Sequence, residues 1–268
     1  MSALTPSAIT KLVRKLGGTV REKQLAVDSL EDLCGDGNPH TLAVITAAGA
    51  IPALEKSGGA LAKLAGNAEN AVTIASAGAI PALVQLLATT STDVQEYAAE
   101  ALATLAANAD HAATIDADGA IPLLVELLRT ASPADVLRSA ARALCILAGN
   151  AKNAVTIASA DAIPALVQLL GSTSPDVQES AAGALSKLAG NAEIAVTIAA
   201  TGAIAALVQL LGSVSPAEVQ LEAIGALRSP AGTAEIAVTI AAAGAISPLV
   251  QLVLPGSDGK TKMPHLAH

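Results

Sequence analysis

The sequence almost lacks aromatic side chains: its 268 residues include one tyrosine and neither tryptophan nor phenylalanine. Charged residues make up only 14% of the chain, whereas hydrophobic residues make up 52%. A core must therefore be built from aliphatic and small side chains, so we expect its elements to pack closely. The net charge is −8, and a nucleic-acid surface needs clustered lysine and arginine. We therefore expect no nucleic-acid partner.

The sequence also lacks the common catalytic motifs. It contains no Gly-x-Gly-x-x-Gly, P-loop or Gly-x-Ser-x-Gly pattern, which serve dinucleotides, phosphates and serine nucleophiles respectively. The stretch from Asp116 to Gly119 matches part of a calcium loop, but the remaining ligands are missing. We expect a protein that is not an enzyme, has no catalytic, cofactor-binding or metal site, and takes no small-molecule substrate.

What the sequence does contain is a repeat. A tetrad of the Gly-Ala-Ile-Pro type begins at residues 49, 78, 119, 161, 202 and 244. The first interval between tetrads is 29 residues, and the other four are 41 or 42. A period near 42 predicts a helical solenoid, in which each unit buries its apolar face against its neighbours.

Capping and breaking residues predict the first two helices of each unit. Asn191 is predicted to cap a first helix over residues 192–200. Gly202 is predicted to end that helix, because glycine enters the left-handed conformation without steric cost. In the equivalent unit before it, Pro164 is predicted to open the second helix at its first position, and Gly171 to stop it.

A third helix follows in each unit. Ser174 is predicted to cap it, and Pro175 to occupy its first position. Apolar residues then recur at helical spacing and predict one buried stripe: Ala181, Ala182, Leu185 and Leu188.

Three helices per unit, with glycine between the first two, are typical of armadillo repeats, whereas other helical repeats near this length have two. The pattern Gly-Ala-Ile-Pro-x-Leu-Val-x-Leu-Leu, followed by Val-Gln-Glu-x-Ala-Ala-x-Ala-Leu, closely resembles the armadillo repeat family over roughly residues 7 to 254. The resemblance implies an all-α, right-handed solenoid of about six repeats. Within the family, the chain resembles vacuole-anchored and plant-type armadillo scaffolds.

The repeat pattern divides the chain into a tail at residues 1–6, an array at 7–254 that is most regular over 78–200, and a disordered tail at 255–268. The second repeat is 12 residues short, because the sequence after Leu54 continues with the pattern that follows Gln178. Two interpretations stay open: a deletion, which we favour, and an evolved hinge.

The last repeat is incomplete. Pro230 is predicted to end the preceding third helix near Leu227, because proline removes a hydrogen bond and clashes with the preceding turn. No third-helix pattern follows Leu254. Since each repeat is stabilised by its neighbours, we expect fast amide exchange in residues 48–66 and beyond about 228, and slow exchange in the central block.

Two other features bear on the protein's environment. Cys34 and Cys145 fall in third helices of different repeats, so we expect buried, reduced thiols of an intracellular protein, cytoplasmic or nuclear. The uncharged runs 194–217 and 236–257 exceed the ~20 residues that cross a bilayer. Each run crosses a glycine corner, so we expect buried solenoid core and no membrane span.

The family resemblance also implies where a partner binds. In armadillo proteins the third helices line a concave groove, and nuclear-import adaptors hold a basic peptide there with a tryptophan and, four residues on, an asparagine. The tryptophan position here reads Asp28, Gly59, Glu100, Arg142, Gly183 and Gly225. The asparagine position reads Asp32, Lys63, Thr104, Ile146, Lys187 and Ser229. Since neither residue type is present, the resemblance does not carry nuclear-signal binding to this chain.

The groove positions still predict a ligand surface. Its candidate residues are Tyr97, Glu100, Thr104, Arg142, Ile146 and Lys187. Their mixed charge suggests a partner of mixed charge, and the only tyrosine is a candidate aromatic anchor. The alternative interpretation is a solvated face that binds nothing.

The sequence therefore predicts a protein-interaction scaffold that binds a protein or an extended peptide along the groove. Two alternatives stay open. A nuclear-import adaptor of the importin-α type would bind a basic peptide, and the substrate-binding part of a ubiquitin ligase would require a catalytic or U-box segment, which these 268 residues lack.

Overall fold

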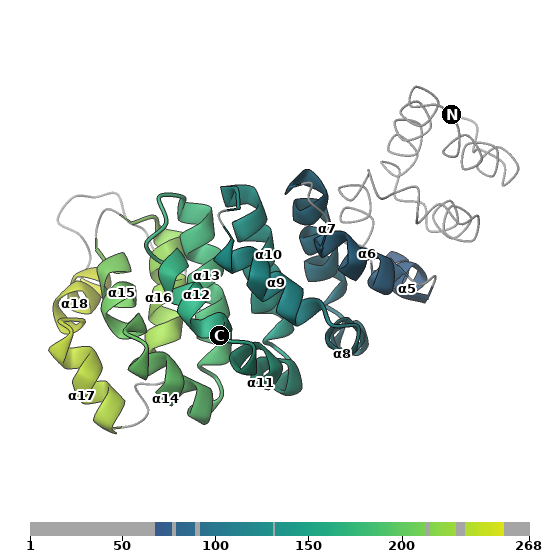
Figure 1. Ribbon diagram of the computed structural model, residues 1–268. Coiled ribbons are helices and arrows are strands. Elements are labelled where there is room, and N and C mark those ends of the chain that lie inside the picture. The colour runs from purple at the N-terminus through teal and green to yellow at the C-terminus, as the bar shows by residue number, and fades with distance from the viewer. Residues whose placement is uncertain are drawn as a thin grey trace, which may run out of the picture.

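The computed structural model describes residues 68–76, 79–88, 92–130, 132–212, 215–228 and 234–254. Every regular element in this part of the chain is an α-helix, which confirms the all-α prediction. Figure 1 shows the helices stacked along one direction as an elongated array, from α5 at one end to α18 at the other.

The helices recur in threes, as predicted. First helices are α5 (Ala68–Ser76), α8 (Ala109–Ala117), α11 (Ala151–Ser159), α14 (Ala192–Ala200) and α17 (Ala234–Ala242). Second helices are α6 (Ala79–Leu87), α9 (Ala120–Arg129), α12 (Ala162–Leu169), α15 (Ala203–Leu210) and α18 (Ile246–Val253). Third helices are α7 (Thr92–Leu105), α10 (Ala134–Leu147), α13 (Pro175–Leu188) and α16 (Ala217–Arg228).

Asparagine side chains start the first helices. Asn191 Oδ1 accepts hydrogen bonds from the backbone N–H groups of Glu193, at 2.9 Å, and Ile194, at 3.2 Å. Asn108 and Asn150 cap α8 and α11 in the same way. These bonds satisfy N–H groups that have no partner within the helix, and they confirm the predicted cap.

The corner between first and second helices depends on a left-handed residue. Gly202 has φ +79°, and Gly119 and Gly244 have φ +82° and +85°. Asp161 occupies the same corner with φ +58° and is the one non-glycine residue with positive φ in the described ranges. Arg129 Nη2 donates a hydrogen bond of 3.2 Å to the Asp161 carbonyl oxygen, which helps to hold this less favourable corner.

Two local predictions need correction. The helix α12 begins at Ala162, so Pro164 is its third residue and not its first. Proline is tolerated there because the first four N–H groups of a helix have no intrahelical acceptor. Ser174 does stand at the N-cap of α13, and Pro175 follows at the first helical position, but the Ser174 side chain makes no capping hydrogen bond.

A glutamine side chain joins the second helix to the third, a contact that was not predicted from the sequence. Gln178 Nε2 donates to the carbonyl oxygens of Leu170, at 3.1 Å, and Ser172, at 2.9 Å. Gln95 and Gln220, at the same position of α7 and α16, donate to the carbonyl oxygen of Leu87, the last residue of α6, and to that of Gly212, in the turn after α15. These bonds occupy carbonyl oxygens at the ends of the second helices and in the turns that follow, where no intrahelical N–H group is available.

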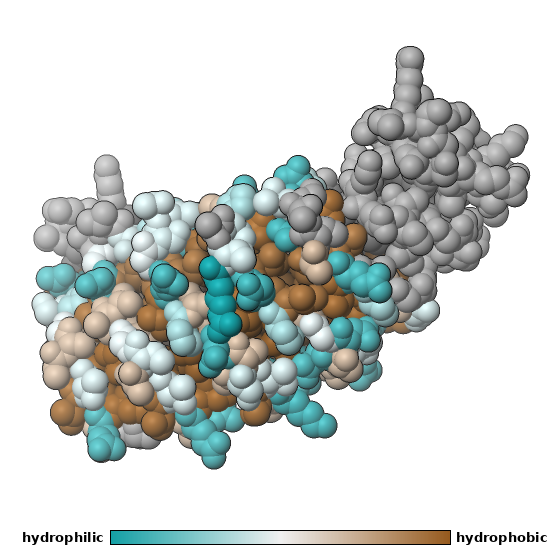
Figure 2. All heavy atoms as spheres, viewed as in Figure 1, coloured by the Kyte–Doolittle hydropathy of each residue, from teal (hydrophilic) through white to brown (hydrophobic). Residues whose placement is uncertain are grey.

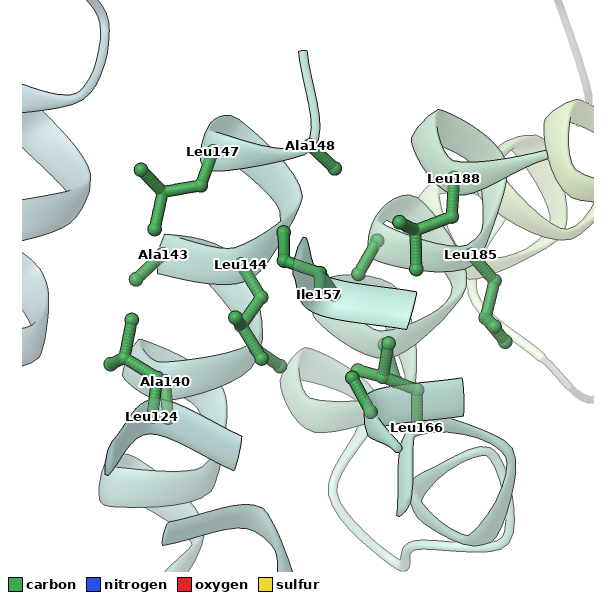
Figure 3. Close-up of a cluster of buried hydrophobic side chains, with 14 of the residues drawn as sticks. Leu124, Ala140, Ala143, Leu144, Leu147, Ala148, Ile157, Leu166, Leu185 and Leu188 are labelled. Atoms are coloured by element: carbon green, nitrogen blue, oxygen red, sulfur yellow. The ribbon is translucent and has the colours of Figure 1, made fainter. Parts of the chain in front are cut away.

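The apolar core runs along the array. All four residues of the predicted stripe on α13 are fully buried, which confirms the register of that helix. Figure 3 shows Leu185 and Leu188 of α13 in one cluster with Leu144 of α10 and Ile157 of α11. Asn153 of α11 is also buried, and its Nδ2 donates a hydrogen bond of 3.0 Å to the carbonyl oxygen of Ala112 in the preceding repeat.

The helix α16 ends at Arg228, one residue from the end predicted from Pro230, and it has 12 residues where α7, α10 and α13 have 14. The predictions for residues 1–6, for the shortened second repeat and for residues 255–268 lie outside the described residues.

No single helix in the described ranges is long and apolar enough to cross a membrane. Two pairs, α14 with α15 and α17 with α18, reach that length and composition only together, and each pair is bent by 85° at its corner.

Candidate protein-binding surface

The four third helices form one continuous layer. α7 packs against α10, α10 against α13, and α13 against α16, and these are the most extensive contacts between described helices. Figure 1 shows the four helices in a row along the array. We call the layer's solvent-facing side the third-helix surface; its predicted ligand residues are Tyr97, Glu100, Thr104, Arg142, Ile146 and Lys187.

Glycines at the tryptophan position let adjacent third helices approach each other. A Cβ atom on Gly183 would lie 3.4 Å from both Cys145 Sγ of α10 and Glu222 Oε2 of α16. A Cβ atom on Gly225 would lie 2.6 Å from Ser186 Oγ, a distance that forces the serine side chain to move. The floor of the surface at α13 and α16 therefore lacks the large side chains that these positions hold in nuclear-import adaptors.

The structure places the six predicted residues on three neighbouring helices. Tyr97, Glu100 and Thr104 lie on α7 at spacings of three and four residues, so they share one face of that helix. Arg142 and Ile146 lie at the matching positions of α10, and Lys187 at the matching position of α13. Tyr97 is 38% exposed, the two cations are exposed, and the other three residues are half-buried.

The hydroxyl of Thr104 is committed within its own helix. Its Oγ1 donates a hydrogen bond of 3.0 Å to the Glu100 carbonyl oxygen. The oxygen keeps its acceptor capacity, so Thr104 can accept a hydrogen bond from a ligand but has no spare donor in this rotamer.

A half-buried ion pair joins α7 to α10. Arg138 Nη2 donates a hydrogen bond of 3.3 Å to Glu96 Oε1, and the side chains of Arg138 and Glu96 are only 25% and 22% exposed. Burial raises the pKa of Glu96, Asp135 raises it further, and Arg138 opposes both. This pair was not predicted from the sequence. Glu96 and Arg138 are 42 residues apart and stand one helical turn before Glu100 and Arg142, and this repeat spacing is the signal that could have revealed the pair.

Acidic side chains on α13 and α16 also flank the surface and were missed. Burial raises the pKa of Glu179, and the nearby Glu222 carboxylate raises it further, whereas Arg142 lowers it. Glu179 and Glu222 therefore repel each other, and Arg142 offsets only part of that repulsion.

Cys145 lies at the base of the surface as a free thiol that is partly buried, whereas the sequence predicted a buried one. Burial, reinforced by Glu222, raises the pKa of this thiol to about 11, while Lys187 and Arg142 oppose the shift. The thiol is therefore protonated at neutral pH and is a poor nucleophile or metal ligand. Cys34 falls outside the described residues.

Within the described ranges, no group of side chains is arranged to hold a metal ion, and one buried hydroxyl of a third helix has no hydrogen-bond partner. Within the described ranges, no three His, Cys, Asp or Glu side chains gather closely enough to hold a metal. Ser139, at the position of Tyr97 on α10, is buried, and its Oγ has no hydrogen-bond partner among the described residues.

Two stretches of the sequence, residues 67–107 and 150–190, match the family model for the armadillo/beta-catenin-like repeat. No curated protein matches the sequence.

Solved structures agree with the family model. An engineered protein from a structural genomics programme is 31% identical, with a TM-score of 0.76 over 84% of this chain and 99% of its own. A designed armadillo repeat protein is 27% identical, with a TM-score of 0.69 over 93% of this chain and 94% of its own. A second designed armadillo repeat protein, solved in complex with the peptide (KR)4, is 28% identical, with a TM-score of 0.68 over 91% of each chain.

Proposed function

Because the chain belongs to the armadillo repeat family, we propose that it is a protein-interaction scaffold that binds an extended segment of a partner protein along a groove formed by the third-helix surface. The supporting observation is the continuous layer of α7, α10, α13 and α16, which presents the six predicted residues side by side on adjacent helices. A segment lying across the layer would meet Tyr97 first, then Arg142, then Lys187.

The charges of the surface favour a partner segment that carries both signs. Arg142 and Lys187 are exposed and form no ion pair with any residue in the described ranges. They are therefore available to carboxylates of the partner. Glu100, Glu179 and Glu222 stand beside them and are available to its lysines or arginines. Tyr97 supplies the one aromatic ring against which an apolar or cationic side chain can pack.

The basic-peptide alternative is less consistent with these residues. One structural neighbour was solved with the peptide (KR)4. In this chain Arg142 occupies a tryptophan position and Lys187 an asparagine position. Two cations in the path of an all-basic peptide would repel it, and no described third helix carries a tryptophan or asparagine at these positions.

The experiment is a selection of binders from a displayed library of random peptides, with affinities measured by fluorescence anisotropy. We expect the selected peptides to contain both acidic and basic residues. Tyr97→Ala and Arg142→Glu should each weaken binding by about tenfold or more, as for central contacts of an interface.

The matched control is Lys152→Glu, which makes the same change of charge at an exposed site on the first helix α11. It should leave the affinity unchanged. Peptides that bind both third-helix variants as tightly as the unaltered chain would refute the proposal. Selection of purely basic peptides, with tight binding of (KR)4, would instead support the adaptor alternative.

A further inference from the structure

The third helices run in the same direction and nearly in register, so equivalent residues form rows along the array. Arg138 of α10 pairs with Glu96 of α7, its equivalent one repeat earlier. At Gly183 of α13, side chains from both neighbouring helices converge, because a Cβ atom there would lie 3.4 Å from Cys145 Sγ of α10 and from Glu222 Oε2 of α16. We call one of these rows the central row; it consists of Glu100, Arg142, Gly183 and Gly225.

Acidic side chains gather on one side of the central row. The first six residues of the four third helices include seven acids and a single cation, Arg138, which is already paired with Glu96. The acids stand three, four or seven residues before the central row, and therefore on the same face of their helices. We call them the acidic edge: Asp93, Glu96, Asp135, Asp176, Glu179, Glu218 and Glu222.

The other side of the central row carries the opposite charge. No acidic residue follows this row within α7, α10, α13 or α16, whereas Lys187 and Arg228 stand in the last turns of α13 and α16. Both side chains are exposed, and neither forms an ion pair with a residue in the described ranges. We call Lys187 and Arg228 the basic edge. The exposed Arg142, on the central row itself, adds a third cation.

Helix dipoles account for only part of this segregation. Acids in the first turn and cations in the last turn stabilise any helix, which explains Asp176 and Lys187. Glu179 and Glu222 lie beyond the first turn, where the effect of the dipole has faded. Burial raises the pKa of Glu179, and Glu222 raises it further, while Arg142 offsets only part of this repulsion. A cation supplied by a partner would relieve it.

Exposed apolar residues do not single out one docking site. Val72, Val155 and Val196 are each about half exposed at one equivalent position of the first helices. Figure 2 shows hydrophobic residues reaching the surface at many places along the array, with hydrophilic residues interspersed among them. Charge, by contrast, is segregated on the third helices, so it is the property by which a partner would be selected there.

We propose, resting on the function given above, that the partner segment is one in which basic and acidic residues alternate, with its basic side chains facing the acidic edge and its acidic side chains facing the basic edge. Successive side chains of an extended chain point to opposite sides. A segment lying along the central row therefore directs alternate residues to the two edges. Alternation sets each charge beside its opposite, whereas other orders of the same residues bring like charges together.

Two synthetic peptides with blocked termini test this order of charges: (KE)4, in which the signs alternate, and (KKEE)2, in which they do not. Both have the same composition and no net charge, so the net charge of −8 on the chain favours neither. Both are too short to form a stable helix. In fluorescence anisotropy with the full chain at low salt, where surface charges are least screened, (KE)4 should bind about tenfold more tightly than (KKEE)2.

Neutral variants then locate the preference. The double variant Glu179→Gln, Glu222→Gln keeps the shape of both side chains and removes two charges of the acidic edge, so it should weaken the binding of (KE)4 by about fivefold. The matched control is Glu193→Gln, Glu235→Gln, which makes the same change of net charge at exposed first-turn acids of α14 and α17. It should leave the affinity unchanged, and far-UV circular dichroism should give both double variants the same helix content.

Two results would overturn the proposal. The first is binding of (KE)4 that is no tighter than that of (KKEE)2, including the case in which neither peptide binds. The second is an equal loss of affinity in both double variants, which would trace the preference to the charge of the whole chain. The function proposed above is tested separately, because peptides selected from the random library would still lose affinity with Tyr97→Ala and Arg142→Glu.

Discussion

Substitution of Leu185 by alanine should be among the most destabilising changes in the array. Leu185 is fully buried on α13, and Figure 3 shows it within the cluster that joins α13 to its neighbours. Removing a buried leucine side chain forfeits its transfer energy and leaves a cavity, which together cost about 2.7–5.0 kcal/mol in other cores. The surrounding positions 181, 182 and 184 are already alanine, and α10 and α16 hold α13 from both sides. Because the site cannot collapse easily, we expect about 3–5 kcal/mol.

Urea unfolding followed by far-UV circular dichroism measures this loss, since the chain has no tryptophan for intrinsic fluorescence. The control is Gln168→Ala on the exposed side of α12, which should change the free energy of unfolding by no more than about 0.5 kcal/mol. If both variants lose the same stability, the helix register that buries Leu185 is wrong.

Three further predictions concern other parts of the structure. Gly202→Ala should lower the free energy of unfolding by about 1–2 kcal/mol, because Gly202 has φ +79°. The control Gly171→Ala should leave the thermal midpoint nearly unchanged, because its new Cβ would meet the Gln168 carbonyl oxygen at an ordinary 3.5 Å; equal losses in both variants would contradict the left-handed corner. In a Cys34→Ser background, Cys145 should react with iodoacetamide at pH 8 about 100-fold more slowly than a free thiol, because burial raises the pKa of Cys145 from 9.0 to about 11. The reaction rate should rise with pH until about pH 11, and a rate equal to that of glutathione would show that the thiol is not buried. Native-state hydrogen exchange should be slow in α12 and α13 and fast in α17 and α18, since α13 buries seven residues and α18 none. Uniform exchange along the array would mean that α17 and α18 are packed more completely than their exposure indicates.

The fold could be predicted from the sequence because each repeat marks its own helix ends. Asn191 and Gly202 act through their own backbone neighbourhood, as a side-chain cap and a left-handed corner, so local sequence was sufficient. Repetition then removed ambiguity, because the same residues recur at a fixed period. Pro164 was misplaced by two residues because proline is tolerated anywhere in the first turn, so its position alone does not fix where the helix begins.

The candidate surface was only partly predictable. The positions of Glu100, Arg142 and Lys187 followed from the helical pattern, because a repeat places equivalent residues on adjacent helices. The Glu96–Arg138 ion pair and the Gln178 hydrogen bonds depend on side-chain conformations and on the spacing between helices. The repeat places Glu96 beside Arg138, and the glutamine recurs at Gln95, Gln178 and Gln220, but the period alone does not show that these side chains form bonds. The close contact at Gly225 likewise depends on how near α13 and α16 approach, which the sequence alone does not give.

A charge-swap experiment on the third-helix surface tests its proposed role most directly. A selected peptide would be altered so that its acidic residue opposite Arg142 becomes lysine, and its anisotropy would be measured with the unaltered chain and with Arg142→Glu. If the peptide lies along this surface, each single change should weaken binding by about tenfold or more, and the two changes together should restore most of the lost affinity. If no substituted acidic position of the peptide gives such recovery with Arg142→Glu, and the two losses simply add, the segment does not lie against Arg142 and the third-helix surface is not the binding groove.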